Sequence, residues 1–143
     1  MIDLCSDLYE ISGAGTQLLT GVPSPINLGM ENNSSSSFES SSGVVSYKGP
    51  VRRFAIGYYV SGNSTTNTRS VASHALYING IELTRSKSYS YHRLLVDGEG
   101  TASKRIVIDL NPGDTIEVRS EVPNANDDVN ILLDQSNLLF ESK

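Results

Sequence analysis

The chain has 143 residues, of which 38% are hydrophobic, a formal net charge of −5 and a single cysteine. This length fits one domain, and the low hydrophobic content indicates that partner subunits contribute to its stability. The negative charge argues against nucleic acid as a partner, and Cys5 alone cannot form an internal disulfide. No apolar run approaches the roughly 20 residues of a membrane helix. The acidic N-terminal segment lacks the basic region of a secretion signal, so we expect a protein that stays inside the producing cell.

Residues 1–15 predict an N-terminal arm that precedes a body spanning residues 16–143. The apolar residues of the arm follow neither a helical nor a strand period, and Ser12–Gly15 then interrupts the pattern. We interpret its apolar side chains as candidates for anchoring the protein to a partner: Ile2, Leu4, Leu8, Tyr9 and Ile11. The alternative is that this segment forms the first edge strand of the body.

The body reads as a series of short strands with turn signals every 8–12 residues. Residues 51–61 give the clearest strand, because Phe54 and Ile56 alternate with Arg53 and Ala55. No segment has a persuasive helical period, and polar runs at 31–37, 61–68 and 121–128 predict exposed loops. The other expected strands lie at 17–22, 26–30, 44–47, 71–78, 81–84, 89–96, 104–110, 115–120, 129–133 and 137–141.

Two turn motifs strengthen this all-β interpretation. Asn79-Gly80 lies between apolar residues, which is the strongest short-range signal for a hairpin. Pro112-Gly113 separates two alternating runs and favours a chain reversal. Together with the strand spacing, these turns predict a β-sandwich or barrel.

The order of these features resembles a known family. Phe38 precedes Gly43-Val-Val-Ser-Tyr47. A long strand ending Tyr58-Tyr59-Val60 follows, and then Tyr77-Ile-Asn-Gly80. Farther along the chain come Ala102-Ser103, Leu110-Asn-Pro-Gly-Asp114 and the final strand Asn137-Leu-Leu-Phe140. Over residues 16–143 the chain resembles the jelly-roll domains similar to tumour necrosis factor and the complement globular head. It looks most like the versions found on bacteriophage particles, in head fibres, decoration proteins and fibre tips.

The resemblance implies a jelly-roll β-sandwich of about ten antiparallel strands that assembles as a homotrimer. In this family, apolar and aromatic residues on the outer face of one sheet form the subunit interface, and tyrosine is common at interfaces. Tyr58, Tyr59, Tyr89 and Tyr91 are our candidates, with ordinary core or surface roles as the alternative. Tyr58 and Tyr59 are adjacent, so one points into the core and the other outward. The chain departs from the family in having three Phe, no Trp and no stalk, which favours a compact knob.

Candidate chemistry in the sequence is sparse. His74 and His92 lie within strand patterns without a nucleophile or acid at motif spacing, so we expect structural or surface histidines. Asn124, Asn126, Asp127 and Asp128 form an oxygen-rich loop for which we expect a solvated turn, with a bound calcium ion as the alternative. We therefore predict no enzymatic activity, no catalytic or metal site and no cofactor.

These inferences predict a structural virion protein. In this hypothesis the chain is a trimeric capsid decoration (cement) protein or head-fibre knob on the virion surface, assembled in the host cytoplasm. Its partners are two further copies and the major capsid protein or another virion protein, and the arm inserts between capsid subunits. The alternative is a host-surface glycan-binding adhesin at a phage fibre tip, in which the polar loops contact sugar hydroxyls.

Overall fold

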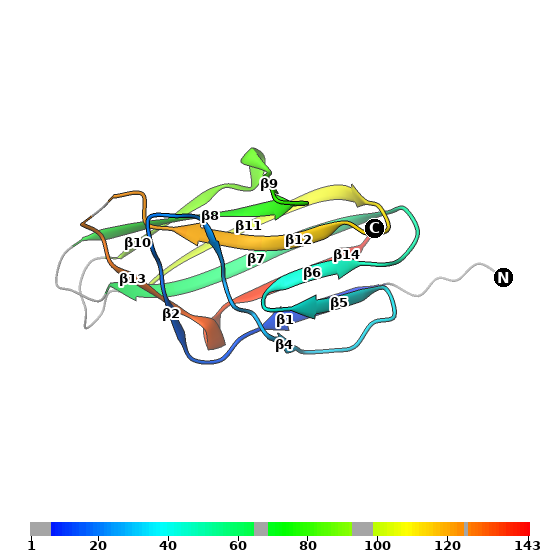
Figure 1. Cartoon of the computed structure of the whole chain (residues 1–143), viewed down its shortest axis with the longest axis horizontal. Helices are drawn as coiled ribbons and strands as arrows, with labels where there is room; N and C mark the ends of the chain where they lie inside the picture. Colours follow the sequence, from blue (N-terminus) through cyan, green and yellow to red (C-terminus); the bar gives the residue numbers. More distant parts are fainter. Residues whose placement is uncertain (1–6, 65–68, 93–98, 125) are drawn as a thin grey trace.

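Two antiparallel sheets pack face to face in the computed structural model, which describes residues 7–64, 69–92, 99–124 and 126–143 (Figure 1). In these ranges the helical structure consists of two short 3₁₀ turns, η1 (Thr84–Ser86) and η2 (Leu133–Gln135). The sequence-based prediction of an all-β jelly-roll sandwich is confirmed.

The first sheet is built around the longest strand and is called here the β7 sheet. Strand β11 pairs with one edge of β7, while β14 and β13 follow one another along the other edge. Strands β1 and β2 extend the sheet from β14 and β13, and β4 pairs with β1. The bounds are β1 (Leu8–Ser12), β2 (Thr16–Leu18), β4 (Met30–Glu31), β7 (Arg52–Ser64), β11 (Gly100–Leu110), β13 (Val129–Leu132) and β14 (Asn137–Ser142).

The second sheet, called here the β8 sheet, has the strand order β10-β8-β12-β6-β5. Strand β9 also pairs with β8, and β3 pairs with β12. Strand β10 hydrogen-bonds to β8 on one side only, so it forms an edge of this sheet. The bounds are β3 (Ser24–Pro25), β5 (Phe38–Ser41), β6 (Val44–Tyr47), β8 (Ser70–Ile78), β9 (Ile81–Glu82), β10 (Ser88–His92) and β12 (Thr115–Glu121).

Both turn motifs form where the sequence predicts them. Asn79 and Gly80 have φ angles of 53° and 80°, as the two central residues of a mirror-image hairpin turn require, and they join β8 to β9. Gly113 has a φ angle of 91° between β11 and β12. Local chemistry therefore sets both chain reversals.

Aromatic side chains fill one end of the space between the sheets. Phe38 is at the centre of this aromatic cluster, with ring centroids 5.0 Å from Tyr9, 5.1 Å from Tyr47, 5.3 Å from Phe54 and 4.9 Å from Phe140. All five side chains are buried, and they come from strands of both sheets. The cluster therefore joins the two layers at the end of the sandwich where β7 begins.

The structure corrects the predicted boundary of the N-terminal arm. Leu8–Ser12 is strand β1, which pairs with β14 on one side and with β4 on the other. The side chains of Tyr9 and Ile11 are buried in the core, so they are not available as anchors, whereas Leu8 is 48% exposed. Ile2 and Leu4 lie outside the described residues. The apolar residues of this segment therefore follow the pattern of a strand whose alternate residues, Tyr9 and Ile11, face inward.

The predicted polar loop at 31–37 covers the edge of β1. The side chain of Asn33 accepts a hydrogen bond from Glu10 N at 2.9 Å and donates one to Leu8 O at 2.6 Å. Tyr9 Oη donates to Glu31 Oε2 at 2.5 Å, and burial together with this carboxylate raises the pKa of Tyr9 to about 12. These bonds satisfy backbone groups that an edge strand would otherwise expose. The loop therefore has a structural role.

Several predicted strand ends also move. The expected strand at 17–22 is reduced to β2 and the one at 26–30 to β4, while β3 forms between them at Ser24–Pro25. Strand β7 extends to Ser64 into the predicted loop at 61–68. Ser61 and Ser64 are buried, and Ser61 N donates to Ser136 Oγ at 3.1 Å. Polar residues therefore continue the strand because neighbouring segments satisfy their hydrogen bonds.

Candidate functional site

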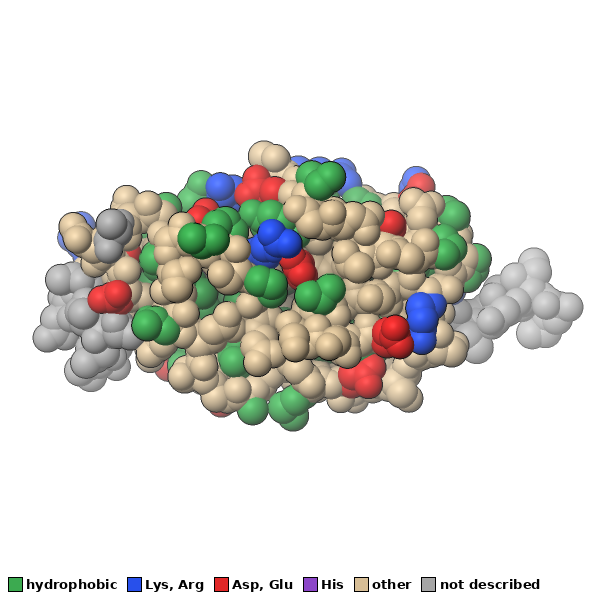
Figure 2. Space-filling model, viewed as in Figure 1, with side chains coloured by type: hydrophobic (Ala, Val, Ile, Leu, Met, Phe, Trp, Pro, Cys, Tyr) green, Lys and Arg blue, Asp and Glu red, His purple; other side chains and the backbone are tan. Residues whose placement is uncertain are grey.

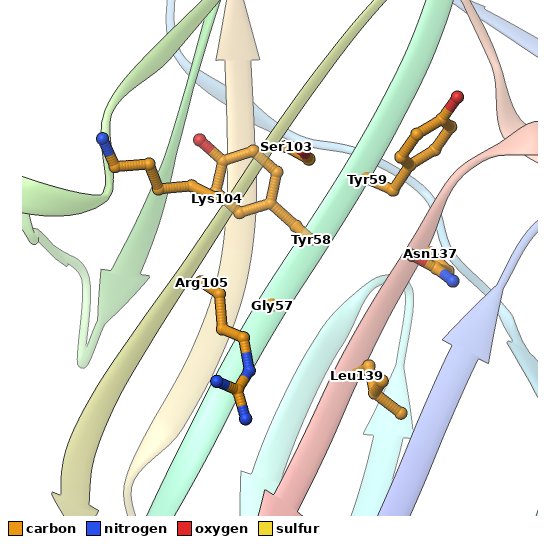
Figure 3. A pocket seen from close by; sticks show the side chains of 8 residues that line it. All are labelled: Gly57, Tyr58, Tyr59, Ser103, Lys104, Arg105, Asn137 and Leu139. Atoms are coloured by element: carbon orange, nitrogen blue, oxygen red, sulfur yellow. The ribbon is translucent and has the colours of Figure 1, made fainter.

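An open depression lies on the outer face of the β7 sheet, away from the core (Figure 3). Its volume is about 430 Å³. Gly57 faces Arg105 across one strand pair and Leu139 across the other, while Tyr59 faces Ser103 and Asn137. The missing side chain at Gly57 leaves the hollow, and its neighbours form the rim. We call this the depression surface; its residues are Gly57, Tyr59, Ser103, Lys104, Arg105, Asn137 and Leu139.

The depression surface carries one cation, Arg105, without an ion-pair partner among the described residues. Arg105 faces Gly57 across the strand pair, whereas Lys104 faces the buried Tyr58, so the exposed Lys104 side chain leaves β11 on the other side (Figure 3). Elsewhere on the same face Arg53 Nε lies 3.1 Å from Asp109 Oδ1. Asn137 Nδ2 donates to Glu10 Oε2 at 2.8 Å, which fixes part of the rim. This part of an acidic protein therefore presents local positive charge beside an apolar hollow.

Tyr58 and Tyr59 point to opposite sides of β7, as their adjacency predicts. Tyr59 is 44% exposed at the depression surface, whereas Tyr58 is buried. Tyr58 Oη donates to Ser86 O at 2.6 Å and is 2.6 Å from Ser88 Oγ, and burial raises its pKa. Tyr58 is therefore a core residue that joins β7 to the opposite sheet, which corrects its assignment as an interface candidate.

Tyr89 and Tyr91 form a second exposed surface, on β10. They lie two residues apart on the outward face of this edge strand, with exposures of 61% and 49%. Across the strand pair they face Ser73 and Val71. Figure 2 shows this side of the molecule, where hydrophobic side chains are scattered rather than gathered into one large patch. We call Tyr89 and Tyr91 the tyrosine surface.

The alternation of β10 is the reverse of the usual pattern. Its tyrosines face outward, while Ser90 and His92 face inward and are buried. Strands with one solvated face normally place apolar residues inside and polar residues outside. A local departure of this kind often marks a functional site, and the Tyr-Ser-Tyr-His order of the sequence contains the signal.

The two histidines meet inside the sandwich. His74 Nδ1 is 2.7 Å from Ser120 Oγ, and His74 Nε2 is 2.8 Å from Ser90 Oγ. The same Ser90 Oγ is 2.8 Å from His92 Nε2. Burial, and to a smaller extent the nearby His92, lowers the pKa of His74 to about 3. We call these four residues the histidine chain. Both histidines are buried and structural, and the sequence did not reveal that they share Ser90.

The acidic loop before β13 is used for hydrogen bonding. Asp127 Oδ2 accepts from Val71 N at 2.9 Å and from Asn124 Nδ2 at 3.3 Å, and Asp128 N donates to Ser70 Oγ at 3.2 Å. Within the part of the chain that the structure describes, no three His, Cys, Asp or Glu residues gather as potential metal ligands. The loop thus connects β8 to β13 through Asp127.

Solved structures similar to this chain have the fold of tumour necrosis factor-like proteins. Eiger TNF from S. frugiperda has a TM-score of 0.63 and 11% identity, with 96% of this chain and 91% of that chain covered. Murine APRIL at pH 8.5 has a TM-score of 0.56 and 12% identity, with 97% and 100% covered. No family model matches the sequence, and no curated protein matches it. The likeness therefore establishes the jelly-roll fold. Across the described residues, no helix is long and apolar enough to cross a membrane.

Proposed function

We propose that this protein is a non-enzymatic structural module that assembles as a homotrimer and decorates the surface of a virus particle. The observation that carries the proposal is the presence of two different exposed surfaces with aromatic residues. The depression surface is on the β7 sheet, and the tyrosine surface is on the edge strand of the β8 sheet.

Two different surfaces favour a ring over a twofold dimer. In a twofold dimer the same surface pairs with its own copy, whereas a ring joins one surface of each subunit to another surface of the next. The resemblance identified from the sequence implies three subunits. We therefore propose that the tyrosine surface of one copy lies against the depression surface of the next.

The chemistry of the two surfaces is complementary. Arg105 is a cation without an ion-pair partner among the described residues, and the faces of Tyr89 and Tyr91 attract cations. Leu139 and the hollow above Gly57 offer apolar space for an aromatic ring. Burial of these side chains in the trimer also accounts for exposed aromatic groups in a chain of low hydrophobic content.

Decoration of a particle is supported by the order of sequence features from Phe38 to Phe140, which resembles proteins of phage heads and fibres. The proposed partners are the major capsid protein or another virion protein, with assembly in the host cytoplasm. Three copies around one axis each contribute one weak contact, and their combined avidity gives stable attachment. Leu8 and the preceding residues 1–6 remain the proposed anchor.

Light scattering coupled to size exclusion tests the trimer. Tyr89→Ser/Tyr91→Ser should convert it to a monomer, as should Gly57→Leu, which fills the hollow. An alanine Cβ at Gly57 would make only ordinary contacts, at 3.6 Å from Lys104 O and 3.8 Å from Arg105 Cγ, so the fold has space at this position. The control Ile81→Ser alters an exposed side chain on β9 and should leave the trimer intact. A wild-type protein that is monomeric at every concentration tested contradicts the proposal.

Cosedimentation tests the biological role. Purified protein is mixed with particles that lack it and, separately, with intact host cells. Binding to particles that disappears when residues 1–6 are deleted supports decoration through the anchor. Binding to cells alone contradicts decoration.

A second candidate function is binding of an acidic glycan at the depression surface. Tyr59 provides a stacking face, Ser103 and Asn137 provide hydrogen-bonding groups, and Arg105 provides positive charge for a carboxylate. This site replaces the loop-based site predicted from the sequence, because the loops at 31–37 and 121–128 hold neighbouring strands through Asn33 and Asp127. This function would be favoured if the wild-type protein is a monomer that binds carboxylated sugars and the Arg105→Ala variant does not bind them.

A further inference from the structure

We propose that the histidine chain is an acid-sensitive latch that holds strand β10 on the edge of the β8 sheet. At neutral pH the latch keeps β10 in place, and acid releases this strand before the rest of the domain unfolds. The consequence for assembly rests on the proposed function, because β10 carries the tyrosine surface.

The geometry allows β10 to respond as a local unit. It has five residues and pairs with β8 alone, so few backbone hydrogen bonds hold it. Among its inward side chains, Ser90 and His92 are members of the histidine chain, and Ser88 Oγ is 2.6 Å from Tyr58 Oη of β7. Edge elements with few partners open at a lower free energy than the core does. The hydrogen bond between Ser90 Oγ and His74 Nε2 is therefore a side-chain attachment of β10 to β8, while the bond between Ser90 and His92 lies within β10.

The hydrogen-bond pattern is complete only when the imidazoles are neutral or carry a single extra proton. Ser90 has one hydroxyl hydrogen, so it can donate to one imidazole Nε2 and accept from the other. When both histidines are protonated, both Nε2 atoms are donors and the Ser90 hydrogen has no acceptor in the chain. Two buried positive charges then also face one another across a single oxygen atom.

Charged groups that could stabilise a protonated histidine lie elsewhere among the described residues. The carboxylate of Glu121 on β12 is on the outer face, near Ser73 Oγ, and that of Asp127 accepts from the backbone of β8. Lys87, next to β10, pairs with Glu82, and Lys104 of β11 is exposed. From β7 the titratable group is Tyr58, whose hydroxyl is 3.2 Å from His74 O. The hydrogen-bond partners described for the His74 imidazole are therefore the hydroxyls of Ser90 and Ser120, which supply no counter-charge for an imidazolium at this position.

The direction of the pH effect follows from linkage. The pKa of His74 is lowered on folding, so protons bind preferentially to the open form, and protection is lost as pH falls below the ordinary histidine value of about 6.5. For one histidine, opening becomes about 100-fold more favourable between pH 7.5 and pH 4.5.

Hydrogen exchange of the full chain tests the latch. Exchange rates at pH 7.5 and pH 4.5, corrected for intrinsic exchange, give the opening constants of β10 and of β6, which serves as the internal control. We expect protection of β10 to fall about 100-fold or more and that of β6 to change much less. The double variant His74→Gln/His92→Gln keeps every carboxylate and should lose the selective effect on β10. Equal acid sensitivity of β10 in the wild type and the variant overturns the latch.

A second measurement keeps the test decisive if the variant does not fold. Imidazole NMR signals of the wild-type protein should show that His74 remains neutral at pH 5, where an ordinary histidine is protonated; a protonated His74 in the folded protein at that pH overturns the proposal. The oligomeric state at acidic pH separates the latch from the proposed subunit interface at the tyrosine surface. Acid-sensitive β10 in a trimer that persists at pH 4.5 supports the latch but contradicts the tyrosine surface as an interface.

Discussion

The two ends of the space between the sheets are built differently. At one end Phe38 and four other aromatic rings pack with centroid separations near 5 Å. At the other end the histidine chain joins β8, β10 and β12 through three hydrogen bonds. Phe54 and Gly62 mark the two ends on β7, since Gly62 lies beside His92. Apolar packing is insensitive to pH, whereas the histidine chain depends on protonation.

The comparison teaches how one sandwich can combine a permanent attachment between its layers with a conditional attachment between the strands of one layer. The aromatic cluster stabilises by excluding water and filling space. The histidine chain stabilises only while its polar atoms are neutral and paired, because an unpaired or charged buried group is costly. Predictions that separate these two mechanisms follow in order of expected effect.

The largest effect is expected from Phe38→Ala. This change removes the ring at the centre of the aromatic cluster and should lower the free energy of unfolding by about 3–5 kcal/mol. Urea denaturation measures it, with the exposed Tyr59→Ala as the control. The loss should be the same at pH 7.5 and pH 5. A loss below about 1 kcal/mol would show that the cluster is not a packed core.

The next effect is the pH dependence from His74. Its pKa is lowered by burial to about 3, so the free energy of unfolding should fall by about 1.4 kcal/mol for each pH unit below about 6. This stability is present above pH 6.5 and is lost as pH falls toward the folded-state pKa. Chemical denaturation at several pH values measures how the free energy of unfolding changes with pH. The His74→Gln variant should reduce this slope by about 1.4 kcal/mol per pH unit, the contribution of one proton. An unchanged slope in the His74→Gln variant would contradict the assignment of this pH dependence to His74.

The smallest effect is expected from Tyr58→Phe. The change removes the hydroxyl that donates to Ser86 O and leaves the volume of the ring in place, so it should lower the free energy of unfolding by about 1–2 kcal/mol. Thermal or urea denaturation measures the loss. Tyr89→Phe, which alters an exposed hydroxyl, is the matched control. Equal effects from the two changes would indicate that the buried hydroxyl makes no net contribution.

Local sequence signals predicted much of the fold. Asn79-Gly80 and Pro112-Gly113 define chain reversals by backbone preference alone, and the long alternating run at 51–61 identified β7. Alternation likewise predicted that Tyr58 and Tyr59 lie on opposite faces, and the structure places Tyr58 inside and Tyr59 outside. These predictions succeeded because the relevant physics acts between residues that are close in sequence.

Only the tertiary structure decided the remaining features. Pairing with β14 made Leu8–Ser12 a strand of the sheet, and the side chain of Asn33 covered its edge. The histidine chain exists because long-range register brings Ser120 of β12 and Ser90 of β10 to the two sides of His74. The depression arises because Gly57 lies between Arg105 and Leu139 on neighbouring strands. Each feature depends on contacts between residues far apart in the chain, which composition and local periodicity do not encode.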